Sequence, residues 1–269
     1  MNAPVQPDSI CISVSQIKEW MLCPKKHALH YRLGAQAEHL PVPLAFGSAF
    51  HAALAYHYGW LMRGEPVPAD EAKQRFVDAM HVARQGEVPL LLDDDEGDAG
   101  FEAILAKGLV MLDVTLGHPS ARPEKVLGVE VPFIVDLYDP DTGEVVDAKL
   151  RGFLDLVLLE DDHRVVVEHK TSSRRYSQEQ LSNDTQLAAY AYAAGQLGFG
   201  EVGLRFSVTC KTKVPALVID DVRRDDADQA DFLRQAVGVL RAIDAGVSFP
   251  VRSWACRSCQ YRRRCESER

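Results

Sequence analysis

The chain has 269 residues, of which 46% are hydrophobic, and this is enough for the core of one large α/β domain or of two small ones. It contains no run of about 18 apolar residues, and its first ten residues lack the basic start and apolar stretch of a secretion signal, so we expect a cytoplasmic protein without a membrane span. The net charge of −9 argues against wholesale coating of nucleic acid, although six arginines in 251–269 leave a local basic surface.

The first 120 residues predict mainly helices. The stretch SVSQ at 13–16 fits a capping box, and the helix behind it should end near Cys23 because Pro24 disfavours helical backbone in the residue before it. The acidic stretch DDDEGD at 93–98 predicts a solvated loop. Further helices are expected at roughly 44–62, 70–84 and 100–116.

The pattern changes to strands between residues 125 and 170. KVLGVEVPFIVDL is followed by a turn at DPDTG, then by VVDAKLRGFLDLVLLE and RVVVEHK. If Asp161 and Asp162 are the two loop residues of a hairpin, Asp155 lies opposite Glu168 on the neighbouring strand.

Two carboxylates and an ammonium group should therefore meet on one patch of the sheet. Side chains alternate along a strand, so Glu168 and Lys170 share a face, whereas His169 points to the other. Directly opposed carboxylates repel each other unless a cation lies between them. Mg²⁺ or Mn²⁺ held by two carboxylates suits phosphodiester hydrolysis, with Lys170 orienting water and stabilising phosphate charge. For the spacing D-x12-E-x-K alone, a surface salt-bridge network is the commoner explanation.

The stretches GFLDLVL and VVVEHKTS resemble the two central motifs of the PD-(D/E)XK nuclease superfamily, in the branch of RecB-like nucleases and CRISPR-associated exonucleases. Three more pieces match in the expected order: FGSAFHAAL resembles the Gly-x-x-x-His helix, VEVP the strand before the Asp strand, and QLAAYAYA the Gln-x-x-x-Tyr helix. The resemblance spans 13–265. It implies a restriction-endonuclease-like α/β fold, with a mixed central sheet flanked by helices, in one domain over 1–269, mainly helical at 13–120 and with its sheet core at 125–222.

The same resemblance implies the roles of the central residues. Asp155 and Glu168 would be catalytic metal ligands, Lys170 the catalytic lysine and His51 an additional ligand of Mg²⁺ or Mn²⁺. The family usually has Tyr or an apolar residue where this chain has His169, but only the backbone carbonyl serves as a ligand there. A lone histidine such as His51 is more commonly a core residue, and its place in the motif order favours the ligand role.

Three further residues are candidates for the second shell or for DNA contact. Gln186 and Tyr190 share a helix face, where the amide could bind a phosphate or base and the ring could stack; a half-buried amphipathic helix is the alternative. Glu130 could be a second-shell residue or a strand-edge acid. Gly47 lies one turn before His51 and leaves open space for a metal or a DNA strand.

Four cysteines predict a second metal centre. Cys256, Cys259 and Cys265 form C-x2-C-x5-C, and Cys23 lies near the other end of the chain. Clustered thiols in a cytosolic protein favour metal ligation, although spacing alone does not decide between zinc and iron–sulfur. The resemblance implies a 4Fe-4S cluster. Cys11 and Cys210 fall outside the pattern and are interpreted as structural thiols.

A cluster joining Cys23 to the segment 251–269 would act as a clasp that holds both ends of the chain over the nuclease core. Basic residues surround it, and we expect them to neutralise DNA phosphates; a solvated basic tail is the alternative. They are Lys25, Lys26, Arg257, Arg262, Arg263 and Arg264.

The sequence thus predicts an exonuclease acting on single-stranded DNA ends, in repair, recombination, phage or CRISPR-related processing. It contains no G-x-x-x-x-G-K-[ST], so unwinding would come from a helicase or from a CRISPR or recombination partner. A non-cleaving DNA-binding module and a redox-sensing iron–sulfur protein are the alternatives. The set of His51, Asp155, Glu168 and Lys170 argues against the first, and the absence of a flavin or nicotinamide fingerprint argues against the second.

Overall fold

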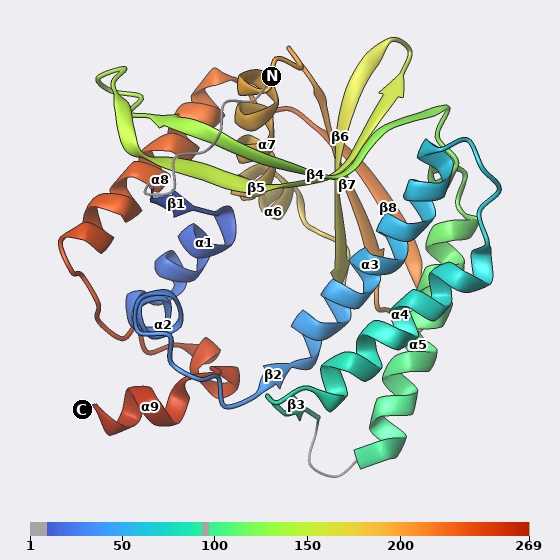
Figure 1. The fold of residues 1–269 in the computed structure, drawn as a ribbon, viewed down its shortest axis with the longest axis horizontal. Coiled ribbons are helices and arrows are strands. Elements are labelled where there is room, and N and C mark those ends of the chain that lie inside the picture. The colour runs from blue at the N-terminus through green and yellow to red at the C-terminus, as the bar shows by residue number, and fades with distance from the viewer. Residues whose placement is uncertain (1–9, 93–96, 269) are drawn as a thin grey trace.

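A twisted mixed sheet forms the centre of the molecule, with helices on both sides (Figure 1). The computed structural model describes residues 10–92 and 97–268. The strand order is β1-β5-β6-β7-β8, with β4 also paired to β5. The strands are β1 (Cys11–Ile12), β4 (Lys125–Tyr138), β5 (Val145–Glu160), β6 (His163–Ser172), β7 (Gly203–Cys210) and β8 (Ala216–Val222). The β6–β7 and β1–β5 pairs are parallel and the others are antiparallel, which confirms the predicted mixed sheet.

The β5–β6 hairpin turns at Asp161 and Asp162, as predicted. Both residues have positive φ, 47° and 62°, which a two-residue hairpin turn requires and which Asp tolerates better than most residues. The ladder runs from Glu160 paired with His163 to Leu156 paired with Val167. One further step in the same register brings Asp155 opposite Glu168.

The β4–β5 hairpin has a register that its turn alone does not set. Next to the turn, Tyr138 pairs with Val145, but an irregularity between Asp136 and Leu137 changes the register, so that Asp136 pairs with Lys149. Beyond this β-bulge the strands continue in the shifted register towards the middle of the sheet.

Helices cover both faces of the sheet and form two hydrophobic cores. One face is covered by α1 (Val14–Leu22), α6 (Gln178–Asn183), α7 (Thr185–Gln196) and α8 (Asp226–Asp244), and the other by α3 (Val42–Met62), α4 (Ala69–Gln85) and α5 (Gly97–Gly117) (Figure 1). Val166 belongs to the first core, whereas Val165 and Val167 belong to the second. Burial on both faces explains the continuous apolar run of β6.

The predicted helices are confirmed in α1, α3, α4 and α5. Ser13 caps α1 in a reciprocal capping box with Gln16, and the helix ends at Cys23 before Pro24. Of the acidic loop predicted at 93–98, residues 93–96 lie outside the described residues, and the last two residues begin α5. Among the described residues, no helix is both long enough and apolar enough to cross a membrane.

The two ends of the chain pack against each other through short elements. After α1 come α2 (Pro24–His27) and a π-helical turn, η1 (Ala28–Arg32); the C-terminal segment contains η3 (Trp254–Ser258) and α9 (Arg262–Ser267). The amide of Lys25 donates to the carbonyl of Phe249, and the amide of Glu38 donates to Gln260. The remaining elements are β2 (Leu40–Pro41), β3 (Leu90–Leu91), which pairs with β2, and η2 (Pro119–Ala121).

Candidate active site

A cleft of about 1090 Å³ collects the predicted catalytic residues. Its walls come from the start of α1, from α3 and α7, and from β4, β5 and β6. The predicted residues that line it are His51, Glu130, Asp155, Glu168, Lys170, Gln186 and Tyr190.

Asp155 lies on β5 at the back of the cleft and is held from two directions. Its Oδ2 accepts a hydrogen bond from the backbone amide of His169 (2.9 Å), and its Oδ1 accepts one from the hydroxyl of Tyr190 (3.3 Å). Only 9% of the residue is exposed. Burial raises the pKa of Asp155 to about 8, and the negative charge of Glu168 adds to the rise. Without a cation, this site therefore favours the protonated carboxyl.

Glu168 and Lys170 form an ion pair on β6. Glu168 is 2% exposed; its Oε1 contacts the Lys170 ammonium, and within the described part of the chain its Oε2 has no hydrogen-bond partner. A buried carboxylate oxygen without a partner is costly, and a bound cation would satisfy it. Burial alone would lower the pKa of Lys170, but the charge and hydrogen bond of Glu168 raise it above its ordinary value. Lys170 is therefore charged at neutral pH.

His51 projects from α3 towards the acidic residues. Its Nε2 lies 3.0 Å from the backbone carbonyl of His169, and because a carbonyl only accepts, Nε2 donates. Its Nδ1 then faces Glu130 Oε1 at 3.9 Å and Asp155 Oδ2 at 3.6 Å. Burial alone would lower the pKa of His51, but Glu130, Asp155 and Glu168 outweigh it and raise the pKa.

This arrangement can hold a hard divalent cation. In the described part of the chain, His51, Glu130 and Asp155 form the one group of at least three His, Cys, Asp or Glu ligand atoms that lie within 4.8 Å of one another. The neutral imidazole has its lone pair on Nδ1, and its other nitrogen is fixed by a carbonyl, as is common for metal-ligating histidines. Carboxylate oxygens with one imidazole suit Mg²⁺ or Mn²⁺, so these residues fit the predicted metal.

Glu130 is closer to the centre than the sequence indicated. Its neighbours Val129 and Val131 pair with Leu156 and Leu154, so Glu130 lies at the position opposite Asp155, on the side away from Glu168. Its φ of 47° breaks the regular extended backbone there. Acids on three neighbouring strands thus form a row across the sheet. Glu130 is therefore a candidate metal ligand, and not only the second-shell residue that the sequence suggested.

The side chain of His169 points away from Glu168, as predicted. Its ring stacks on Tyr58 of α3, with ring centroids 5.5 Å apart. Complete burial lowers the pKa of His169 to about 3, so the ring is neutral. The backbone of His169 serves the site: its amide donates a hydrogen bond to Asp155, and its carbonyl accepts one from His51.

Tyr190 does not have the role that its place on an amphipathic helix suggested. It is 2% exposed, so the prediction that its ring stacks on a base is wrong. Burial raises the pKa of Tyr190, and the hydroxyl stays protonated as a donor to Asp155. Gln186 begins the same helix one turn earlier and lines the cleft, so its proposed contact with a phosphate or base stays a prediction.

The four predicted cluster ligands come together at the ends of the chain. Cys23, Cys256, Cys259 and Cys265 line one small cavity, which also contacts Lys26 and Arg262. Cys11 and Cys210 lie outside this cavity, in β1 and β7. Burial raises the pKa of the Cys259 thiol. Among the described residues, no three of these thiols approach within 4.8 Å of one another.

The basic residues around this cavity are less available than the sequence suggested. Lys25 pairs with Glu268, and Lys26 pairs with Glu19 at 2.8 Å. Arg262 and Arg264 of α9 pair with the acids four residues later in the chain, and Arg263 lies 3.9 Å from Glu38. Acids thus offset part of the positive charge around the cavity, and the expected contact of these basic residues with DNA phosphates stays a prediction. Neither Arg262 nor Arg263 lines the catalytic cleft.

Comparison with known proteins agrees with this geometry. The sequence model of the PD-(D/E)XK nuclease superfamily matches residues 11–266. No curated protein matches the chain in sequence. The fold is similar to a crystal structure from Eubacterium rectale described as a "putative exonuclease", with a TM-score of 0.58 and 14% identity over 100% of this chain and 94% of that chain. A crystal structure described as SSO0001 has a TM-score of 0.39 and 16% identity over 94% of this chain and 97% of that chain.

Proposed function

Because the chain belongs to the PD-(D/E)XK nuclease superfamily, we propose that the cleft is the active site of a metal-dependent nuclease that hydrolyses DNA phosphodiester bonds. One observation carries the proposal: three acids, an imidazole and a charged lysine converge in one cleft, where a buried oxygen of Glu168 has no partner within the described residues. A purely structural salt-bridge network would satisfy that oxygen.

Mg²⁺ or Mn²⁺ would be held by Asp155, Glu168 and His51, with Glu130 as a further candidate and with the His169 carbonyl in the role that the family resemblance implies. Such an ion, when bound, is a Lewis acid for the phosphate and activates a water molecule. The close approach of the His51, Glu130 and Asp155 ligand atoms supports a metal at this place, and the buried, unpartnered Oε2 of Glu168 supports that residue as a ligand.

The protein's own residues position and stabilise the reacting groups. Hydrolysis forms a bond from a water oxygen to phosphorus and breaks the bond from phosphorus to the leaving oxygen, which then takes up a proton. Lys170 is charged and cannot accept a proton at neutral pH, so it acts as a donor that stabilises the phosphate oxygens. Tyr190 and the amide of His169 hold Asp155 in place.

Single-stranded DNA ends are the proposed substrate, and exonuclease action the proposed mode. The family resemblance to RecB-like nucleases supports this, and so does the description of the similar Eubacterium rectale protein as an exonuclease. A helicase or a CRISPR or recombination partner would supply unwinding, since the sequence has no P-loop motif. Repair, recombination, phage and CRISPR-related processing in the cytoplasm are the settings in which we place it.

A 4Fe-4S cluster bound by Cys23, Cys256, Cys259 and Cys265 is the second part of the proposal. All four thiols line one cavity, which supports a shared group. Four thiols suit either a single zinc ion or an iron–sulfur cluster, and the family resemblance supports the cluster. Its role would be to hold the chain ends together.

Two measurements test these assignments. Labelled single strands with the 3′ or the 5′ end blocked in turn, incubated with Mg²⁺, Mn²⁺ or EDTA, should be cut only with metal and only from an open end. Metal-dependent binding without cutting would instead indicate a DNA-binding module. Protein purified without oxygen should be brown and contain four iron atoms per chain, and a colourless protein with one zinc would contradict the cluster.

A further inference from the structure

Phe153 and Arg151 lie beside the catalytic residues without taking part in the chemistry proposed above. Both belong to β5 and are two residues apart, so their side chains share one face of the strand. Both are exposed and line the same cleft as Asp155. On β4 they pair with Pro132 and Ile134, which line the cleft as well.

The exposed ring of Phe153 is part of an apolar lip. Phe153 is 56% exposed, and it is joined in the cleft by Leu44 of α3, which is 54% exposed, and by Ile134. Leu44 lies two turns before His51, so both side chains lie on the same face of α3. A single exposed apolar side chain needs no explanation, but three that line one functional cleft indicate contact with an apolar surface of a ligand.

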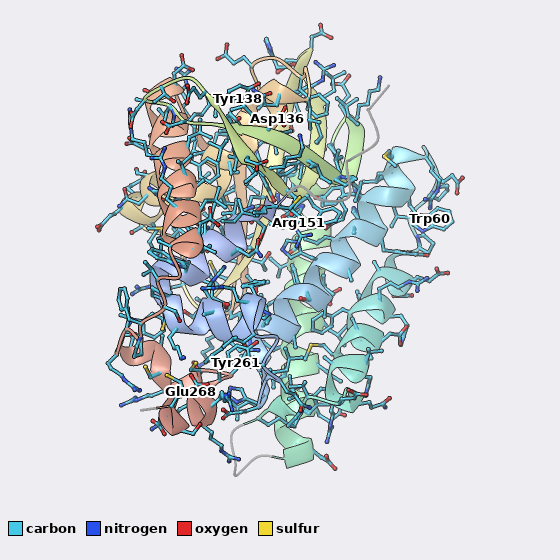
Figure 2. All side chains as sticks on the ribbon, turned by 60° about the vertical axis from the view of Figure 1, so that its left-hand side comes forward. Trp60, Asp136, Tyr138, Arg151, Tyr261 and Glu268 are labelled. Carbon is cyan, nitrogen blue, oxygen red and sulfur yellow. The ribbon has the colours of Figure 1, made fainter. Side chains whose placement is uncertain are left out.

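Arg151 supplies a positive charge that the protein itself leaves unpaired. Arg151 and Lys170 are the two Lys or Arg side chains that line the cleft in the described part of the chain, and Lys170 is paired with Glu168. Lys149, two residues earlier on β5, is likewise paired, with Asp136. Arg151 makes no ion pair with any described residue. Figure 2 shows it in the middle of the molecule, beside α3 and far from Tyr261 and Glu268 at the C-terminal end.

We infer that Phe153 and Arg151 form a ledge that binds single-stranded DNA: Phe153 stacks on a base next to the phosphate that is cleaved, and Arg151 pairs with a neighbouring phosphate. This inference rests on the proposed nuclease function. An unstacked base offers its flat apolar face to an aromatic ring, whereas the bases of a duplex are stacked on each other and do not. The ledge therefore selects single strands over duplexes, at the point where the strand enters the acidic site.

The role of Phe153 is tested by binding. Labelled oligonucleotides are titrated by fluorescence anisotropy in Ca²⁺, in place of Mg²⁺, to limit cleavage. Phe153→Ala should weaken binding of a single strand roughly 5- to 150-fold, in the range of one lost base–aromatic stack, while Phe153→Trp should restore it. Duplex binding should change little. A strand of abasic residues should bind wild type and Phe153→Ala equally, because it offers no base to stack on.

The role of Arg151 is tested by salt. Loss of one phosphate contact should reduce the slope of log K against log salt concentration by about 0.7 for a single strand. Arg151→Ala should show this reduction, and Arg151→Lys should keep the wild-type slope because it keeps the charge. Arg223→Ala, an exposed arginine outside the cleft, is the matched control and should also keep it.

The two proposals can fail separately. Unchanged single-strand binding by Phe153→Ala, or an equal loss on single strands and duplexes, would overturn the ledge even if wild-type protein cuts DNA. Wild-type protein that binds single strands through Phe153 but cuts nothing would overturn the nuclease function and leave the ledge in place. Thermal melts of the variants should match wild type, since both side chains are exposed.

Discussion

The catalytic cleft and the cysteine cavity both gather metal-ligand side chains, but they rest on different kinds of structure. In the cleft, Asp155 and Glu168 lie on neighbouring strands in the middle of the sheet, next to two hydrophobic cores. In the cavity, the ligands come from opposite ends of the chain and from short elements: η3 and α9 contain no buried residue. The packed strands of the sheet hold the first site, whereas the second has little apolar packing of its own.

The two regions also differ in their electrostatics: the charges of the cleft are buried, and those around the cavity lie near the surface. In the cleft, burial of opposed carboxylates is unfavourable until a cation binds. The rest of the fold therefore has to offset the cost of keeping these ligands in place. Around the cavity, ion pairs such as Lys25 with Glu268 lie near the surface, where solvent screens them and each adds little to stability. We therefore expect ligand changes in the cleft to abolish activity and leave the fold intact, and ligand changes in the cavity to loosen the fold.

The largest effect is expected for Asp155→Asn. It removes one of the carboxylates that hold the metal, so cleavage should fall by at least about 100-fold, while the amide keeps the shape of the side chain. Nuclease assays and thermal melts on the same samples measure this. Asp147→Asn, an exposed residue on the same strand, is the matched control and should cut like wild type. Cleavage by Asp155→Asn at the control rate would contradict the site.

Cys23→Ser should have the opposite profile. Without the bound cluster, the cavity no longer joins the chain ends. A loss of about 3 kcal/mol in the free energy of unfolding would lower Tm by roughly 6–12 °C in a chain of this size. Cys11→Ser, which lies in β1 outside the cavity, is the control and should keep both colour and Tm close to wild type. If Cys23→Ser melts with the control, the cavity does not hold the ends together, whatever it binds.

A pH series of metal-free protein should reveal the cost of the buried carboxylates. The folded-state pKa of Asp155 is raised to about 8, above the unfolded value, so the folded state keeps a proton that the unfolded state loses. Stability should therefore fall as pH rises from about 4 to about 8, by ~1 kcal/mol or more. The raised pKa of His51 acts in the same direction, because its stabilising charge is lost as pH rises.

Asp155→Asn separates this contribution from the rest of the protein. The variant should lose much of the pH dependence and be more stable than wild type near pH 8 in EDTA, while Asp147→Asn should follow wild type. Excess Mg²⁺ should flatten the wild-type curve, because the ion binds the deprotonated form. Chemical denaturation at each pH measures it, and a wild-type stability that rises between pH 5 and pH 8 in EDTA would contradict the buried charge.

The sequence predicted those features that local rules determine. A two-residue turn at Asp161 and Asp162 fixes the register of its hairpin, and so the opposition of Asp155 and Glu168 follows from residue spacing alone. The position of Glu130 does not follow from residue spacing. If the register of the β4–β5 hairpin is counted from its turn, Glu130 lies opposite Phe153. The β-bulge between the turn and the site shifts Glu130 to the position opposite Asp155.

Burial and long-range pairing set the remaining limits. Tyr190 lies on a helix that is buried on nearly all sides between the sheet and α8, which the amphipathic pattern of its sequence does not reveal. The i,i+4 pair of Arg262 with Glu266 was readable from spacing, but Glu38 reaches Arg263 from far away in the chain. Because of such tertiary contacts, most of the basic residues around the cysteine cavity are paired with acids.

The smallest expected effect concerns Gly47, which tests whether the open space in the cleft serves the ligand. A Cβ on Gly47 would meet nothing within 4 Å, so Gly47→Ala should stabilise α3 by about 0.5–1 kcal/mol through helix propensity. Gly195→Ala, equally unobstructed on α7, should show the same gain. Leucine at the same two positions should separate them in function. Gly47→Leu should leave the protein stable and weaken DNA binding several-fold, because the new side chain enters the cleft. Gly195→Leu should leave DNA binding unchanged, because Gly195 lies outside the cleft. Equal DNA binding by both leucine variants would mean that the space beside His51 is not used by the substrate.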